Sequence, residues 1–403
     1  MRTQLKTLTL AAAAALTATA HAGDKEILDI LVKKGTITAE ERGKILEESK
    51  AKTASANLDE VFAKEDALKR LTISGRVQFQ YASIDTEQGT VNPATVNQFM
   101  ARRLYLGVAA DMGDGFSGEI VNNFVDNTLD KALVTVDKSF GKFEIGYRKT
   151  YVVVEETTSS SKIPTVERSL ATRYFTEGKT TQGGDLGGRH TGVFYTGKQG
   201  DWTYGASVFG TKFADNGAAS ATNNNDLGYG LTLGYKTKVS DAEIYAAGVN
   251  YVASGFAGTG TPAVSELSIL NPYVDVTLGN TNLVAELILA DFKDVANTPS
   301  PTGLNVTLVQ KLDDSWSAVA RYSKLDADGR ASIDVSDSIR RGNDANISTT
   351  FTKADSLYLG VIYKISGDNV KLTAGYEMAD FKGATGATKA NADVIRAQVQ
   401  ILF

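Results

Sequence analysis

The feature that most constrains this chain is an alternation of apolar and polar residues that begins at Leu71. In the segment Leu71–Ser83, the apolar residues Phe79 and Tyr81 are at odd-numbered positions, and the polar residues Gln78 and Gln80 are at even-numbered positions. We call this odd or even position the parity of a residue. Successive side chains of a β-strand point to opposite faces of the sheet. The segment therefore predicts a strand with an apolar environment on one face and a polar environment on the other.

The alternating segments come in pairs that are joined by tight turns. The turn sequences MGDG, KQGD and SGDN supply the Gly, Asp and Asn residues that hairpins require. The predicted pairs are Gln98–Asp111 with Phe116–Asp126, Lys131–Lys138 with Lys142–Tyr151, Thr191–Gly197 with Trp202–Phe213, Leu227–Lys236 with Glu243–Tyr251, Ser265–Leu278 with Leu283–Phe292, Leu304–Leu312 with Trp316–Leu325, and Leu357–Ile365 with Val370–Phe381. Together with Leu71–Ser83 and Val394–Phe403 they make about sixteen strands, an even number as in bacterial barrels.

The connections between pairs are longer and more polar, as in Asp85–Asn97, Ala214–Asp226 and Ala327–Lys353. Short turns on one side and long loops on the other are typical of an outer-membrane barrel. The alternative, a soluble β-sandwich, is built from shorter strands. The predicted fold class is therefore all-β, a transmembrane antiparallel β-barrel of about 16 strands with a short N-terminal helical periplasmic segment.

Two segments precede the predicted barrel. Residues 1–22 read as a signal peptide, with Arg2 and Lys6 before an apolar stretch and an A-x-A cleavage site that ends at Ala22. Residues 23–70 have helical spacing, and Thr38 and Glu41 form a predicted capping box. This second segment is interpreted as a periplasmic helical segment or plug, or as a coiled-coil element that promotes assembly.

The composition excludes several function classes. The chain has no cysteine, and His190 is the one histidine that remains after the leader, so thiolate and His-rich metal sites are not expected. G-x-S-x-G, H-E-x-x-H and Walker motifs are absent from the sequence. We therefore expect no enzyme activity, no cofactor and no metal. The net charge of −5, without a basic block, argues against nucleic acid as a partner.

The alternation stops for more than thirty residues in the stretch 152–188. An insertion of this length is usually functional or disordered. Its apolar residues give it the means to pack against a surface; they are Ile163, Val166, Leu170, Tyr174 and Phe175. We expect this stretch to fold into the barrel 71–403 and to narrow it.

Parity predicts which charges face the lumen, because a charge on the lipid face costs roughly 2–4 kcal/mol at the midplane. The strand residues assigned to the lumen are Arg76, Arg103, Arg148, Arg321, Lys371 and Arg396, and the loop adds Glu155, Glu156, Lys162, Arg168 and Arg173. Such charges either bias ion selectivity or only hydrate the lumen and pair across it. For Glu167 and Arg168, a structural role in tethering the loop to the wall is an equal alternative.

Several segments resemble the phosphate-selective porin O and P family. The similar stretches are ISGRVQFQY, FMARRLYLGV, LDKALVTVD, FEIGYRKTY and TTSSSKIPTVERSLATRYF. The resemblance implies a trimeric sixteen-stranded porin whose third loop lines a constriction with cations. It assigns the paired arginines of the second strand to Arg102 and Arg103, and an acidic position near the pore to Asp130.

Anion-selective members of this family carry a lysine near the start of the inward loop, where this chain has Glu155 and Glu156. Lys162 is a substitute for that lysine. The expected constriction therefore has mixed charge and looser selectivity than a phosphate filter.

The expected function is a water-filled channel for passive diffusion of small hydrophilic solutes and ions, with phosphate or other anions as candidates. The alternative is an envelope anchor or adhesion scaffold whose N-terminal helical segment is the working part. The expected location is the outer membrane of a Gram-negative bacterium. The expected partners are the bilayer and its lipopolysaccharide, two further copies in a homotrimer, and the insertion machinery, which would recognise the last strand and its terminal Phe403.

Overall fold

The computed structural model describes two units of the chain, Met1–Leu71 and Thr72–Phe403. The described residues are 29, 32–34, 38–44, 70–89, 91–176, 188–210, 227–255, 264–294, 298–339, 350–384 and 389–403. The predicted signal peptide and most of the predicted helical segment lie outside them. No helix among the described residues is both long enough and apolar enough to span a membrane.

The first unit contains a short helix at residues 39–44. The Thr38 hydroxyl accepts a hydrogen bond from the Glu41 N–H at 3.1 Å, and the Glu41 carboxylate accepts one from the Thr38 N–H at 2.8 Å. These reciprocal bonds confirm the predicted capping box.

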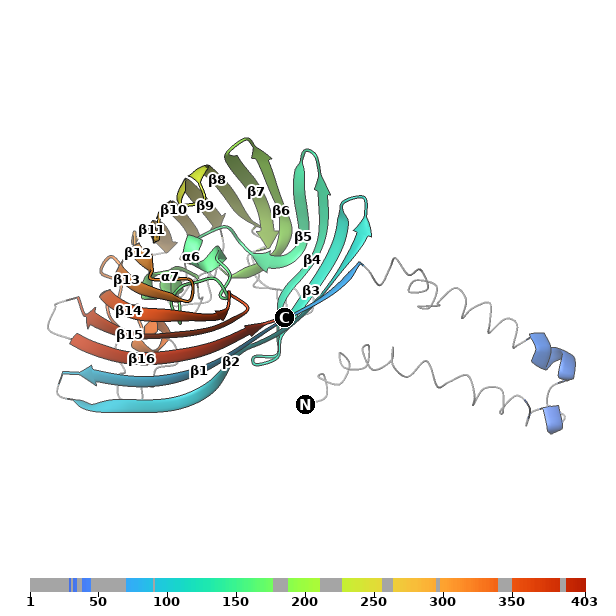
Figure 1. Cartoon of the computed structure of the whole chain (residues 1–403), viewed down its shortest axis with the longest axis horizontal. Helices are drawn as coiled ribbons and strands as arrows, with labels where there is room; N and C mark the ends of the chain where they lie inside the picture. The colour runs from blue at the N-terminus through green and yellow to red at the C-terminus, as the bar shows by residue number, and fades with distance from the viewer. Residues whose placement is uncertain are drawn as a thin grey trace. The chain divides into compact units, whose positions relative to one another are not determined.

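The second unit is a closed barrel of sixteen strands in which β1 pairs with β16 and every described pairing is antiparallel (Figure 1). This confirms the predicted fold class. The strands are β1 (Leu71–Gln88), β2 (Val91–Gly113), β3 (Phe116–Asn123), β4 (Thr128–Lys138), β5 (Gly141–Lys149), β6 (Arg189–Gln199), β7 (Trp202–Gly210), β8 (Leu227–Ser240), β9 (Glu243–Gly255), β10 (Val264–Leu278), β11 (Thr281–Asp294), β12 (Thr302–Lys311), β13 (Trp316–Asp326), β14 (Lys353–Ser366), β15 (Val370–Lys382) and β16 (Lys389–Leu402). Short helices are α6 (Val154–Thr157), α7 (Leu170–Thr176) and α8 (Val335–Ile339).

One predicted long connection is wrong. The stretch 85–97 was expected to be a loop, but β1 and β2 run through it and leave only residues 89 and 90 between them. Its polar residues keep the strand alternation, since Thr86 is buried while Asp85 and Glu87 are exposed. A strand that projects beyond the bilayer carries polar residues on both faces, and composition alone makes such a strand look like a loop. The β3–β4 connection is short, at residues 124–127, and the predicted strand bounds also left four residues between these strands.

The barrel has the reverse of a soluble protein's polarity. On β1, Phe79 is 48% exposed on the outer face, whereas Gln78 and Gln80 are 0% and 2% exposed on the inner face. The inner polar groups bond one another, because the Gln78 amide donates to Gln400 at 2.6 Å and the Gln80 amide donates to Gln398 at 3.1 Å. The outer face therefore suits lipid and the inner face suits water.

The same β1–β16 seam has a close contact near the turn end of the barrel. The Gly75 N–H donates to the Phe403 carbonyl at 2.8 Å, and the Phe403 N–H donates to the Gly75 carbonyl at 3.2 Å. A Cβ on residue 75 would lie 2.1 Å from the Phe403 ring. Glycine is therefore required for the ring to lie flat on β1.

An apolar core fills part of the barrel interior. The segment that carries α6 and α7 lies within the curve of the strands (Figure 1). Its residues Val153, Leu170 and Phe175 are buried in one cluster with inward-facing wall residues, among them Ile288 and Phe381. The predicted apolar residues of the loop are buried, with exposures of 0–3%; they are Ile163, Val166, Leu170, Tyr174 and Phe175.

Candidate constriction site

The inward loop is held first by Glu286 on β11. Its carboxylate accepts the Val154 N–H at 2.9 Å and the side-chain amide of Asn305 at 3.0 Å, and a second amide, that of Asn271, donates to it at 3.2 Å. Glu286 is 3% exposed. An ionised carboxylate accepts hydrogen bonds and donates none, so this set of three N–H donors matches it. The start of α6 is thereby fixed to the wall.

A second anchor is Arg321 on β13, which is 1% exposed. Its guanidinium bonds Glu155 at 3.1 Å and the Glu167 backbone carbonyl at 2.7 Å on the loop side. On the wall side it bonds Glu377 at 3.0 Å. One buried arginine therefore links two points of the loop to the barrel.

A third anchor joins Glu167 to the wall. Arg102 on β2 donates to both carboxylate oxygens of Glu167, at 2.5 and 3.1 Å, and the Gln80 amide donates at 2.9 Å. Both partners of the ion pair are about 5% exposed or less. Of the two alternatives for Glu167, this geometry corresponds to a structural tether. Arg168 instead pairs within the loop, with Glu156 at 2.8 Å.

Glu156 is held between two cations. It contacts Arg168 and also pairs with Lys149 at the end of β5. Burial raises the pKa of a carboxyl, but here Arg168 and Lys149 more than offset burial and hold the pKa of Glu156 at about 2. Glu156 is therefore ionised, and its charge is matched by its neighbours.

The tip of the loop lies against β1 and β15. Arg76 donates to the hydroxyls of Ser160 at 2.6 Å and Ser159 at 3.0 Å, and Lys371 donates to the Ser161 carbonyl at 2.7 Å. The next residue, Lys162, is exposed. Among the described residues, its ammonium forms no ion pair.

The wall formed by β4, β5 and β6 carries partly exposed ion pairs. Glu144 on β5 contacts both Lys142, at 2.9 Å, and Arg148. Asp130 on β4 pairs with Arg189 on β6. Side-chain exposures of these five residues run from 12% to 40%. Water in the lumen therefore reaches this wall.

The structure separates the sequence-predicted site residues into two groups. One group is buried at 4% exposure or less, so its side chains are covered and their part in the constriction stays a prediction; they are Arg102, Arg103, Arg173, Arg321, Lys371 and Arg396. The loop, α7 and the α8 segment cover them. The other group is less deeply buried, and its members lie on the loop or on the wall beside it. Their role in permeation stays a prediction; they are Arg76, Asp130, Arg148, Glu155, Glu156, Lys162 and Arg168.

Arg102 and Arg103 are consecutive in β2, yet both are 4% exposed. Above them Phe99 faces outward, and below them Leu106 and Val108 face outward, so the parity of the strand changes between the two arginines. An extra residue in one strand produces this change. Arg103 donates to the Gln78 side chain at 2.8 Å.

Sequence reasoning missed four residues of this site, namely Lys142, Glu144, Lys149 and Arg189. Lys142 and Glu144 share the parity of Arg148 on β5, so alternation could have found them. Lys149 and Arg189 lie at strand ends next to the loop, where alternation carries no information.

The described residues hold no cluster of three or more His, Cys, Asp or Glu side chains that could bind a metal. His190 is 3% exposed, its Nδ1 lies 2.8 Å from the Gly210 carbonyl, and its ring contacts Phe209. This is the environment of a structural histidine.

A sequence model of the phosphate-selective porin O and P family matches residues 71–269. That stretch includes β1–β9, the inward loop and the paired arginines. This match identifies residues 71–269 with the phosphate-selective porin O and P family. Members of this family are porins, so the chain is a channel protein of the Gram-negative outer membrane. No curated protein matches the chain.

Solved porins share the fold of this chain. The anion-selective porin from Comamonas acidovorans is 13% identical with a TM-score of 0.57, and the match covers 83% of this chain and 99% of that one. OprB of Pseudomonas putida is 11% identical with a TM-score of 0.59, and the match covers 86% and 97%. At these identities the similarity concerns the fold alone.

Proposed function

We propose that this porin is a passive diffusion channel for small hydrophilic solutes and ions, and that it prefers anions, with phosphate among the candidates. The observation that carries the proposal is the charge balance at the inward loop. Lys162 is exposed at the loop tip, whereas Glu155 and Glu156 are held in ion pairs.

Two of the ion-pair groups carry excess positive charge, whereas Arg321 is shared by two carboxylates, Glu155 and Glu377, and their group carries excess negative charge. Glu144 contacts two cations, Lys142 and Arg148, and Glu156 likewise contacts two. One unit of positive charge therefore remains at each of these last two carboxylates. Charges at a narrowing act at short range through a low-dielectric surround, so they bias which ion enters. This revises the mixed-charge expectation toward anions.

The test is the reversal potential of purified protein in a planar bilayer under a KCl gradient. We expect discrete conductance steps. We also expect a reversal potential whose sign shows that chloride permeates more readily than potassium. Lys162→Glu is expected to move the reversal potential toward that of potassium, because it reverses the charge at the tip. Lys236→Glu, on β8 near the tight-turn rim, is the matched control and should leave it unchanged.

Absence of conductance steps would overturn the channel and favour the envelope anchor, in which residues 23–70 are the working part. A wild-type preference for cations, or an identical reversal potential in the Lys162→Glu protein, would overturn the anion filter. Whether phosphate is a solute of the channel is tested by adding phosphate and measuring the decrease in chloride current. A channel of this kind performs no chemical step, so the proposal does not include an enzyme.

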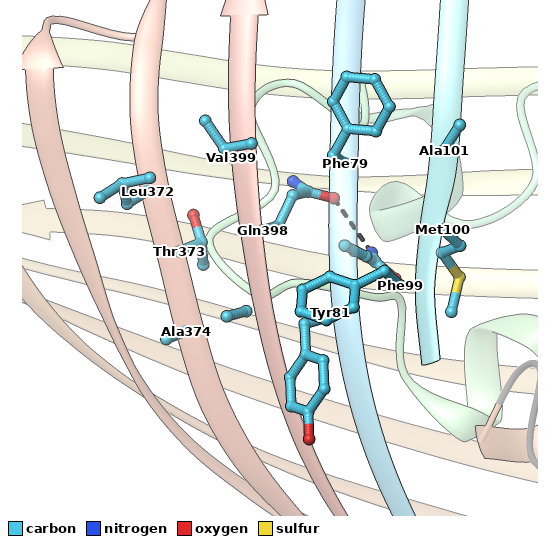
Figure 2. A pocket seen from close by; sticks show the side chains of 12 residues that line it. Phe79, Tyr81, Phe99, Met100, Ala101, Leu372, Thr373, Ala374, Gln398 and Val399 are labelled. Atoms are coloured by element: carbon cyan, nitrogen blue, oxygen red, sulfur yellow. Dashed lines mark hydrogen bonds between the residues drawn. The ribbon is translucent and has the colours of Figure 1, made fainter. Parts of the chain in front are cut away.

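We also propose export by a signal peptide at residues 1–22 and insertion through recognition of the last strand and Phe403. The proposed assembly is a homotrimer. A hollow of about 740 Å³ crosses the outer face of β15, β16, β1 and β2, with Phe79, Tyr81 and Phe99 on the side of β1 and β2 and Ala374 on β15 (Figure 2). Ala397 on β16 also lines it. We propose that a second copy of the chain fills this hollow. The hollow is lined by aromatic side chains and small alanines, which suit an inserted protein side chain better than they suit lipid.

A further inference from the structure

Three lysines form a row on the outer face of β14, β15 and β16. Lys353 is directly opposite Lys382, and Lys382 is directly opposite Lys389. The residues next to them in sequence, Ala354 and Phe381, are 3% and 1% exposed, so the lysines point away from the barrel interior. We call Lys353, Lys382 and Lys389 the lysine row.

The lysine row is costly without a ligand. Like charges directly opposite one another on paired strands are destabilising. Lys353 pairs with Asp326 at 2.8 Å and Lys382 with Asp355 at 3.6 Å, but both lysines are more than half exposed. Exposed pairs of this kind contribute little. Among the described residues, Lys389 has no ion pair, so the row is open to an external anion.

The next outward row toward the bilayer is acidic. Asp355 is opposite Asp380, Asp380 is opposite Asn391, and Asn391 is opposite Glu87 on β1. The acidic row therefore crosses four neighbouring strands. Carboxylates accept hydrogen bonds and do not donate them, so a ligand that suits this row carries hydroxyl or amide donors.

The depth of the two rows matches lipid headgroups. The outward residues of β14 are apolar from Leu357 to Ile365, eight residues further on. At ~3.4 Å per residue and a tilt of ~45° this stretch spans ~20 Å of bilayer, close to the ~25 Å apolar band of such barrels. Lys353 lies four residues beyond Leu357, at the end away from the tight turns. The lysine row is therefore at the surface of the outer leaflet.

We propose that the lysine row and the acidic row together bind a phosphorylated glycolipid of the outer leaflet. Its phosphates bond the lysines, and its sugar hydroxyl and amide groups donate to the carboxylates below them. A glycerophospholipid has a phosphate but lacks donors at the depth of the acidic row. This inference rests on the membrane location of the proposed function and is independent of ion preference.

The test is native mass spectrometry of the full barrel in dodecyl maltoside micelles, titrated with lipid A or with phosphatidylglycerol. Lipid A is expected to bind the wild type, and Lys353→Gln/Lys382→Gln/Lys389→Gln is expected to weaken binding about tenfold or more. The control Lys236→Gln/Lys238→Gln/Lys311→Gln removes as many charges at the opposite rim and should bind as the wild type does. The three corresponding Lys→Arg changes in the lysine row should retain binding.

Equal binding of lipid A by the Gln variant, or loss of binding in the Arg variant or in the rim control, would overturn the site. Equal affinity of the wild type for phosphatidylglycerol would overturn the glycolipid assignment. The lysine-row variant should keep the wild-type conductance and reversal potential, because its lysines face outward. Failure of the wild type to conduct would therefore defeat the channel without affecting the lipid result.

Discussion

Arg102 and Glu167 are buried partners, so removing one of them leaves a charge without its match. Arg102→Met is expected to destabilise the barrel by ~3–5 kcal/mol, and Arg102→Met/Glu167→Leu by less, because the double change removes both charges. The control Lys131→Met breaks the half-exposed Glu119 pair and should cost under ~1 kcal/mol. The measurement is guanidinium unfolding in micelles followed by tryptophan fluorescence. A double variant that is less stable than the single one would contradict this account.

The acid dependence of the loop follows from Glu156. Its pKa falls from the ordinary 4.5 to about 2 in the folded protein, so its ion pairs contribute stability above pH 4.5 that is lost as the pH falls toward 2. We expect the difference in channel conductance between the wild type and Glu156→Gln to be constant from pH 7 to pH 5 and to change only in more acidic buffer. Glu156→Gln should remove that acid transition, and a transition that persists in this variant would assign it to another group.

At this scale, sequence reasoning predicted where side chains point but not what covers them. Parity placed Arg321 and Arg396 on the inner face, and they are there. Their partners, Glu155 on the loop and the Ile339 carbonyl in α8, are distant in sequence. Alternation describes one strand at a time, so it cannot show that a loop has closed over an arginine.

Among the elements, the α8 segment was not predicted to enter the barrel. Ser332 shares a hydrogen bond with Tyr174 of α7 at 2.8 Å, and Ile333 and Ile339 are 0% and 4% exposed. The sequence predicts a long polar connection over 327–353, because the few apolar residues of this segment have no strand period. The inward loop was recognisable because its apolar residues are more numerous and the alternation stops on both sides of it.

Ile333→Ala/Ile339→Ala should loosen the α8 segment, since each buried Ile→Ala change costs ~2–5 kcal/mol of packing. We expect a larger single-channel conductance with an unchanged reversal potential, because the segment fills the mouth while Lys162 stays in place. Ile365→Ala, at a 57% exposed outward position, is the control. A shifted ion preference in the double variant would show that α8 also positions the charged tip.

At the scale of the whole molecule, closure into sixteen strands was predictable from strand count and turn placement. Assembly of several copies is a separate question. Ala374→Trp/Ala397→Trp fills the outer hollow and should convert a trimer to monomers in light-scattering chromatography. Ala318→Trp is the matched control, because Ala318 lies in register with the same row on β13. A trimer that survives the double change would place the subunit contact elsewhere.

The seam between β1 and β16 also has a kinetic consequence. Gln78 and Gln400 bond across it although 322 residues separate them in the chain. Contacts this distant in sequence form slowly. Until β16 arrives, β1 is a bare sheet edge, and such edges pair readily with other chains. The interval before closure is thus when aggregation competes most strongly with folding, and a factor that shields β1 in that interval would raise the yield of barrels without changing their final stability.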